Sequence, residues 1–241
     1  MPQDEPAPSY ELLEMLSIGR DGVSQSLDGL VGVSVGFSSA LLHDLRQPVS
    51  AILFNALAAL KLFRKDEPSG QPIIEESLKD IINEVDRLKT LLQGLGTYLG
   101  LGGDDIPGLD VNPTVTGALG LLAGESVRRQ MRLGTDLGLS LPALRISPSL
   151  LTRAVIALAL DFFQALETAP ADLRQICVWT GLTEGYVKIG FQARTQALLE
   201  GKGPSIPLQL QSWGGQLFVS KELPDKITWG IELPTRPDSS L

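Results

Sequence analysis

Residues 42–63 read LHDLRQPVSAILFNALAALKLF, and their apolar positions recur at alternating spacings of three and four residues. The apolar stripe consists of Leu42, Leu45, Val49, Ile52, Ala56, Ala59 and Phe63. A stripe with this heptad period is typical of helices that pack side by side at a shallow angle. The sequence therefore predicts one long helix here and a second helix packed along it.

The predicted partner helix is the next apolar stripe along the chain. Its members are Ile74, Leu78, Ile81, Val85, Leu88, Leu92 and Leu95. Between the two stripes, residues 66–72 read DEPSGQP, and the two prolines and the glycine favour the end of one helix and the start of another. Two long helices joined by so short a turn form an antiparallel hairpin.

The first helix carries more apolar side chains than one partner helix covers. A second apolar set lies beside the stripe and consists of Leu41, Leu53, Leu57 and Leu60. Two explanations stay open at this point. Either a second copy of the chain completes a four-helix bundle, or the second half of the chain covers this surface.

Composition excludes several classes of function. The 241 residues include 20 Lys and Arg against 28 Asp and Glu, and the net charge of −8 disfavours a nucleic-acid partner because a polyphosphate backbone repels an acidic protein. A single cysteine excludes a disulfide framework, and one cysteine with one histidine cannot form an ordinary zinc site. Any imidazole chemistry must use His43.

The sequence divides into an N-terminal tail (1–22), a helical hairpin (23–100) and, after a glycine-rich connection, an α/β unit (108–236). Residues 1–9 contain two acids, three prolines and no basic residue, so we expect neither a signal peptide nor a mitochondrial leader. The apolar run at 30–42 is too short to span a bilayer. We expect a cytoplasmic protein with no membrane partner.

The α/β unit shows two helical segments and several alternating apolar segments. We expect helices at 113–129 and 148–169, strands at 132–141, 176–181, 186–192 and 227–233, and the end of a helix followed by a strand at 213–219. Ser147 followed by Pro148 is a good cap and first-turn pair for the second helix. These segments predict a small α/β unit.

Four further residues of the α/β unit receive structural interpretations. Cys177 falls in an alternating segment and is expected to be a buried apolar filler. The three tryptophans are interpreted as core or partner-contact residues: Trp179, Trp213 and Trp229.

His43 belongs to a polar strip on the first helix. The strip recurs at helical spacings and consists of Ser39, His43, Arg46, Gln47 and Ser50. Because His43 comes one residue after a stripe position, its side chain is predicted to point away from the hairpin seam. An ordinary solvent-facing histidine is the alternative interpretation.

The neighbours of His43 favour a functional role. Pro48 lies within an otherwise strong helical pattern, where a proline costs roughly 3 kcal/mol and removes a backbone hydrogen bond one turn back, near His43. Such local violations are concentrated at functional sites. Asp44 places a carboxylate beside the imidazole, able to orient it and accept its proton, and a neutral imidazole is a competent nucleophile near pH 7.

Residues 43–52, HDLRQPVSAI, resemble the phosphoacceptor motif of sensor histidine kinases, and the resemblance extends over about residues 25–98. It implies that His43 is the phosphoacceptor, that Asp44 is the supporting acid or base, and that the hairpin forms a dimeric four-helix bundle. Arg46 and Pro48 belong to the surrounding motif. At Gln47 the chain departs from members with strong phosphatase activity, which usually have Thr or Asn there.

The same resemblance implies that residues 108–236 form an ATPase-type domain, a two-layer α/β sandwich of helices on a mixed sheet. Its nucleotide motifs are degenerate in this chain. The pair of asparagines falls on Ala157 and Asp161, the glycine-rich acidic box falls on 193–197 without acid or glycine, and the lid is reduced to 198–204. Gly201-Lys202-Gly203 lacks the spacing and the hydroxyl of a P-loop and is interpreted as a turn. We therefore expect no bound ATP.

The leading hypothesis is a histidine phosphotransferase of a phosphorelay, moving a phosphoryl group between receiver-domain aspartates through His43. The expected partners are response-regulator receivers or a hybrid histidine kinase, with Mg²⁺ supplied by the receiver and no cofactor held by this chain. The receiver-docking residues are expected to be Ser39, Arg46, Gln47, Pro48 and Ser50. Three alternatives stay open: a non-catalytic pseudokinase or dimerisation adaptor, an active divergent histidine kinase, and a plain helical scaffold.

Overall fold

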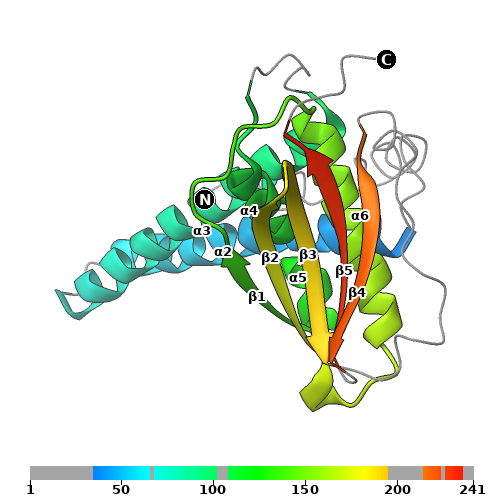
Figure 1. Cartoon of the computed structure of the whole chain (residues 1–241). Coiled ribbons are helices and arrows are strands. Elements are labelled where there is room, and N and C mark those ends of the chain that lie inside the picture. The colour runs from blue at the N-terminus through cyan, green and yellow to red at the C-terminus, as the bar shows by residue number, and fades with distance from the viewer. Residues whose placement is uncertain (1–34, 66–67, 102–107, 195–213, 224–225, 236–241) are drawn as a thin grey trace.

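The computed structural model describes residues 35–65, 68–101, 108–194, 214–223 and 226–235. The predicted hairpin is confirmed: α2 (Val35–Lys65) and α3 (Gln71–Leu99) lie antiparallel along each other and are joined by the short 3-10 helix η1 (Pro68–Gly70) (Figure 1). Helix α3 ends at Gly100, whose φ of 75° is the left-handed conformation that glycine adopts without strain.

The predicted α/β sandwich is also confirmed. Its helices are α4 (Val111–Leu121), α5 (Ala123–Arg128) and α6 (Pro148–Leu166), with a 3-10 turn η2 (Ala171–Leu173). Its strands are β1 (Arg132–Leu137), β2 (Gln175–Thr183), β3 (Tyr186–Arg194), β4 (Gln216–Leu223) and β5 (Lys226–Pro234). They form a sheet in the order β1-β2-β3-β5-β4, in which only β1 and β2 are parallel. The helices cover one face of the sheet (Figure 1).

Several element boundaries differ from prediction, and for two of them the structure gives a reason. The single helix expected at 113–129 is broken at Leu122 into α4 and α5, with Gly120 and Gly124, both poor helix formers, on either side of the break. The strand expected at 132–141 ends at Leu137. There the Asn112 side chain from α4 donates a hydrogen bond to the Gly138 carbonyl, while the Thr180 hydroxyl of β2 donates to the Asn112 side chain.

Helix α6 begins as its sequence predicts and forms the centre of the core. The Ser147 hydroxyl accepts a hydrogen bond from the Leu150 N–H, and Pro148 occupies the first turn. By length and hydropathy alone α6 is apolar enough to cross a membrane, but 67% of that window is buried within the fold. Its hydropathy is therefore explained by its position between the sheet and the hairpin.

The hairpin and the α/β domain (the described residues from 108 to 235) share one hydrophobic core. Phe37 and Leu41 of α2 and Tyr98 of α3 are buried in the same cluster as α4, α6 and the sheet. The Arg153 guanidinium of α6 donates a hydrogen bond to the Tyr98 carbonyl at 2.9 Å, and burial raises the pKa of the Tyr98 phenol to about 12. The two parts of the chain are thus docked rather than linked only by residues 101–108.

The hairpin seam is turned relative to the predicted stripes. Along both helices, every second residue of the predicted stripe is more exposed than the residue immediately before it. The more buried residues are Leu41, Pro48, Asn55 and Leu62 on α2, and Ser77, Glu84 and Leu91 on α3. The predicted seam residues that are exposed instead are Ala56, Phe63, Leu78, Val85 and Leu92. The apolar surface of each helix is broader than one partner covers, and the α/β domain packs on the side of Leu41.

Each of the two explanations for the second apolar set, cover by the α/β domain and cover by a second copy of the chain, can account for only part of that set. The α/β domain covers Leu41, Leu53 is half-buried, and Leu57 and Leu60 are exposed. The half of the hairpin nearer its turn therefore exposes apolar side chains that the described chain does not cover.

The tryptophans occupy different environments. Trp229 lies in the core and meets Phe162 of α6 edge to face at 5.1 Å between ring centroids. Trp179 lies on the face of the sheet away from the helices, above Gly190, where any Cβ would overlap the indole ring. Trp213 falls outside the described residues, as does the predicted tail at 1–22.

The shared core predicts that a hairpin substitution destabilises the α/β domain. We expect Leu41→Ala to lower the free energy of unfolding by about 2–5 kcal/mol, the usual cost of removing a buried leucine side chain. Urea unfolding followed by tryptophan fluorescence measures this effect in the α/β domain, because all three tryptophans lie at or after residue 179.

Leu139→Ala is the control for that experiment, since Leu139 is 92% exposed and its loss should change stability by no more than about 0.5 kcal/mol. An unchanged fluorescence midpoint in Leu41→Ala would show that the two parts of the chain unfold independently.

Candidate functional site

The polar strip lies on the solvent side of α2. The His43 side chain is 69% exposed, and the remaining exposed members are Ser39, Arg46, Gln47 and Ser50. His43 therefore points away from the hairpin seam, as its spacing predicts. Its role as a phosphoacceptor stays a prediction, since exposure makes the imidazole accessible but does not by itself give it a function.

Pro48 is buried and α2 continues through it. It therefore lies beside the strip and offers little surface to a docking partner, in contrast with the exposed Arg46 and Gln47. Because proline has no N–H, the carbonyl of Asp44 lacks its usual partner four residues later. The missing helical hydrogen bond therefore lies next to His43, as the position of Pro48 in the sequence predicts.

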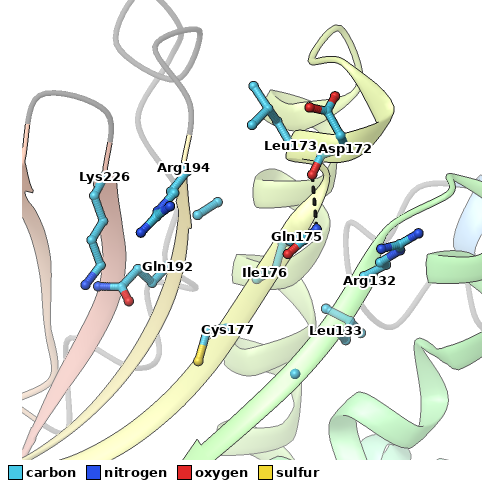
Figure 2. Close-up of a pocket in the computed structure, with 12 residues that line it drawn as sticks. Arg132, Leu133, Asp172, Leu173, Gln175, Ile176, Cys177, Gln192, Arg194 and Lys226 are labelled. Atoms are coloured by element: carbon cyan, nitrogen blue, oxygen red, sulfur yellow. Dashed lines mark hydrogen bonds between the residues drawn. The ribbon is translucent and has the colours of Figure 1, made fainter.

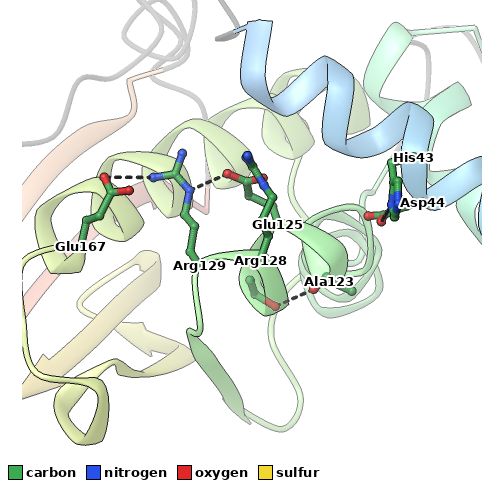
Figure 3. A network of polar contacts seen from close by, with 8 residues as sticks. His43, Asp44, Ala123, Glu125, Arg128, Arg129 and Glu167 are labelled. Atoms are coloured by element: carbon green, nitrogen blue, oxygen red, sulfur yellow. Dashed lines mark hydrogen bonds and ion pairs between the residues drawn. The ribbon is translucent and has the colours of Figure 1, made fainter.

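Asp44 is the buried half of the candidate pair. Its side chain is only 11% exposed, and its Oδ1 lies 3.7 Å from Nδ1 of His43, somewhat beyond hydrogen-bond distance. The carboxylate therefore faces the Nδ1 side of the imidazole (Figure 3). A carboxylate on this side of the ring can attract a proton to Nδ1, which would leave Nε2 as the nitrogen with the free electron pair.

Helix α5 closes over Asp44 from the α/β domain. The Asp44 carboxylate rests against Gly124, and a Cβ at that position would overlap both carboxylate oxygens. The candidate site is thus formed by two elements that are distant in the sequence. Residue spacing on α2 predicted the His43–Asp44 pair, but it did not predict α5; the only signal was a glycine within a predicted helix.

Helix α5 is itself held by a network of charges (Figure 3). The Glu125 carboxylate is 1% exposed and accepts hydrogen bonds from Arg128 and Arg129, and Arg129 also lies 3.7 Å from Glu167 at the end of α6. Burial alone raises the pKa of Glu125, but the hydrogen bonds and charges of the two arginines outweigh it and lower that pKa below its ordinary value. Arg174 donates to the carbonyls of Ala169, Arg129 and Glu167.

A hollow of about 700 Å³ lies away from the His43 site, on the face of the sheet that the helices leave uncovered. Arg132, Arg194 and Lys226 reach it from three strands, and Cys177 lies on β2 between them (Figure 2). Cys177 is half-buried here rather than a core filler, so that prediction was wrong. Burial and the charge of Asp136 raise the pKa of its thiol. The hollow includes none of the predicted site residues.

The positions aligned with nucleotide motifs are only partly described. Ala157 and Asp161 lie on α6, and Ala193 and Arg194 end β3. The remainder of the degenerate box (195–197) and the reduced lid (198–204), including Gly201-Lys202-Gly203, lie outside the described residues. Within the described ranges, no group of three His, Cys, Asp or Glu side chains is placed to hold a metal ion. The expected lack of bound ATP stays a prediction.

Comparison with known proteins relates the chain to signalling kinases. No protein-family model matches it. It is 26% identical over 185 residues to the sensor histidine kinase TmoS of Ectopseudomonas mendocina, an alignment that covers 76% of this chain and 18% of TmoS. The chain thus spans less than a fifth of the length of that relative.

Solved structures give low overall superposition scores. The Acinetobacter baumannii histidine kinase AdeS is 13% identical, with 80% of this chain and 98% of AdeS covered and a TM-score of 0.40. The histidine kinase ThkA, solved in complex with the response regulator TrrA, is 13% identical, with 94% and 68% covered and a TM-score of 0.39.

The Glu125 network predicts a pH-dependent contribution to stability. We expect Glu125→Gln to lower the free energy of unfolding by roughly 2 kcal/mol at pH 7, since it removes the carboxylate charge that accepts three hydrogen bonds from Arg128 and Arg129. Because the pKa of Glu125 is lower in the folded state than in the unfolded state, the contribution is full above the ordinary glutamate pKa and is lost as the pH falls through the folded value.

Urea unfolding of both proteins between pH 7 and pH 3 measures this effect. The difference between wild type and Glu125→Gln should shrink below about pH 4, where a protonated glutamate resembles glutamine. A difference that grows toward low pH would contradict the assignment.

Proposed function

We propose that this chain, which is 26% identical over 185 residues to a sensor histidine kinase, carries out histidine phosphotransfer without ATP. In this proposal His43 takes a phosphoryl group from a phospho-aspartate of one receiver domain and passes it to the aspartate of another. The observation that carries it is the pairing of an exposed imidazole with a buried carboxylate on its Nδ1 side.

The proposed reaction follows from that geometry. Nε2 of neutral His43 attacks phosphorus, the N–P bond forms, and the P–O bond to the receiver aspartate breaks so that the aspartate leaves as a carboxylate. The imidazole now carries a positive charge, which Asp44 stabilises through the Nδ1 proton. In the second step an aspartate carboxylate of the next receiver attacks phosphorus, the N–P bond breaks and neutral His43 is restored.

The receiver supplies the Mg²⁺ in this proposal, because phosphoryl transfer depends mainly on positioning and charge neutralisation. Two features of the chain support that division. No described trio of metal-ligating side chains surrounds His43, and the carboxylate nearest to it is turned toward the protein interior. The exposed members of the polar strip, above all Arg46 and Gln47, are left to contact the receiver.

The α/β domain serves as a fixed wall of the site in this proposal. Its core is continuous with the hairpin, and α5 lies against Asp44. The aligned nucleotide positions Ala157 and Asp161 lack the paired asparagines of the resembled family. We therefore propose a phosphorylated protein as the phosphoryl donor, and we place the protein in the cytoplasm with its receivers.

We propose a homodimer as the assembled form. The half of the hairpin nearer its turn exposes large apolar side chains that neither α2 nor α3 covers within the described chain: Phe54, Leu57, Phe63, Leu78, Ile82, Val85 and Leu92. Large apolar side chains left exposed along two packed helices are typical of an association surface. A second hairpin packed on it completes a four-helix bundle.

Phosphotransfer predicts a specific labelling pattern. Incubated with ATP and Mg²⁺ alone, the chain should take up no acid-labile phosphate, whereas with a phosphorylated receiver it should become labelled. We expect His43→Ala to abolish the label, because the chain has no other histidine, and Asp44→Asn to slow transfer about 100-fold.

Each other outcome favours a different function. Label from ATP alone would indicate an active divergent kinase, and no label under either condition would favour the non-catalytic adaptor. Label that persists in His43→Ala would refute the site. Circular dichroism of each variant checks that the fold is intact.

The dimer is tested by adding a charge to its proposed interface. We expect Phe54→Glu to convert the dimer to a folded monomer, because a carboxylate cannot be buried there without a partner. Analytical ultracentrifugation measures the mass, and Leu139→Glu, on the exposed surface of the α/β domain, is the matched control. A wild-type monomer at high protein concentration would contradict the proposal.

A further inference from the structure

We propose that Gly124 is a positioning residue for the phosphotransfer site, an inference that rests on the proposed function. Because α5 has no side chain at this position, its backbone closes directly on the Asp44 carboxylate and holds it beside Nδ1 of His43. The α/β domain would thereby set the orientation of the group that assists the nucleophile. Gly124 itself touches neither the imidazole nor the phosphoryl group.

The first argument is the contrast in burial between two adjacent residues of one helix. His43 is largely exposed, whereas the Asp44 side chain is almost covered. Helix α5 packs on α2, and the backbone of Gly124 is in contact with the carboxylate. The α/β domain therefore covers Asp44 and leaves His43 open.

The second argument is that nothing in the backbone of α5 requires a glycine. Gly124 is absent from the glycines with positive φ among the described residues, which are Gly100, Gly108, Gly185 and Gly214. Glycine is a poor helix former, and in α4 both Gly117 and Gly120 leave open space for an added Cβ. Gly124 differs from them, since a Cβ there would overlap the carboxyl carbon and both oxygens of Asp44.

The third argument is that the backbones on both sides of this contact are held in place, so that only the Asp44 side chain is free to yield. Arg128 and Arg129 pair with the buried Glu125 next to Gly124, and the Ser126 hydroxyl donates to the Ala123 carbonyl at 2.7 Å. On the other side, Leu41 and Pro48 are buried neighbours of Asp44 on α2. An added methyl group must therefore displace the carboxylate or separate α5 from α2.

Displacing the carboxylate has a definite chemical consequence. In its present position Asp44 favours the Nδ1–H tautomer of neutral His43, the form in which Nε2 carries the free electron pair. Without a fixed carboxylate, the tautomer that exposes Nε2 loses its support, and so does the positive charge that forms during transfer. Asp44 would still be present, but its carboxylate would no longer be held beside Nδ1 of His43.

The experiment compares wild type, Gly124→Ala, and the control Gly120→Ala, whose Cβ meets nothing within 4 Å. Three quantities are measured: the rate of transfer from a phosphorylated receiver, the Tm, and the His43 tautomer from imidazole ¹⁵N chemical shifts. The single histidine makes the last assignment unambiguous. We expect Gly124→Ala to transfer at least tenfold more slowly, to shift toward the Nε2–H tautomer and to have a lower Tm. Gly120→Ala should match wild type in rate and tautomer and have an equal or higher Tm.

A double-mutant cycle separates positioning from general damage. In an Asp44→Ala background the overlap is gone, so we expect adding Gly124→Ala to leave the tautomer and the transfer rate unchanged and to raise the Tm or leave it unchanged. If Gly124→Ala does not fold while the double variant does, the contact is again supported. A double variant that also fails to fold, or an equal loss of Tm in both backgrounds, would overturn the proposal.

This design distinguishes the inference from the proposed function. If wild type takes up no phosphoryl group, the proposed function fails, while the tautomer and Tm still decide whether Gly124 positions Asp44. If wild type is labelled and Gly124→Ala matches it in rate and tautomer, positioning by Gly124 alone is refuted.

Discussion

The burial of Phe37, Leu41 and Tyr98 in the core of the α/β domain is the contact on which the remaining architecture depends. Each such side chain removed from water contributes about 1.5–3 kcal/mol, so this contact joins the hairpin base to the domain as one body. It brings α5 to the level of His43 on α2 and orients α6 across the end of α3 through Arg153 and the Tyr98 carbonyl. The site is a product of this docking.

The docking also explains why neighbouring residues of α2 have opposite environments. His43 lies on the side of the helix that faces solvent, and Asp44 lies on the side that α5 covers. A nucleophile must be reachable by its partner, whereas a group that only orients it and balances its charge works best when it is held fixed. In the proposed function, the charge network around Glu125 would hold α5 in that supporting position.

Much of the fold could be predicted from local pattern, and the exceptions have physical reasons. Heptad spacing and the DEPSGQP turn predicted both helices of the hairpin, but they misplaced half of the seam because spacing along one helix does not say which flank a distant domain will cover. The pair His43 and Asp44 was visible in the sequence as a motif. Gly124 and the half-buried position of Cys177 were not, since each depends on the packing of elements far apart in the chain.

The shared core has a kinetic consequence. A catalytic domain on a loose tether would meet a histidine on its own chain at an effective concentration on the order of millimolar, and its turnover would be independent of partner abundance. Here the domain is docked beside the histidine, and in the proposed function it supplies no phosphoryl group, so every phosphoryl group must arrive and leave by diffusional encounter with a receiver. The rate of phosphoryl transfer through the protein would then rise and fall with the concentrations of the free donor and acceptor receivers.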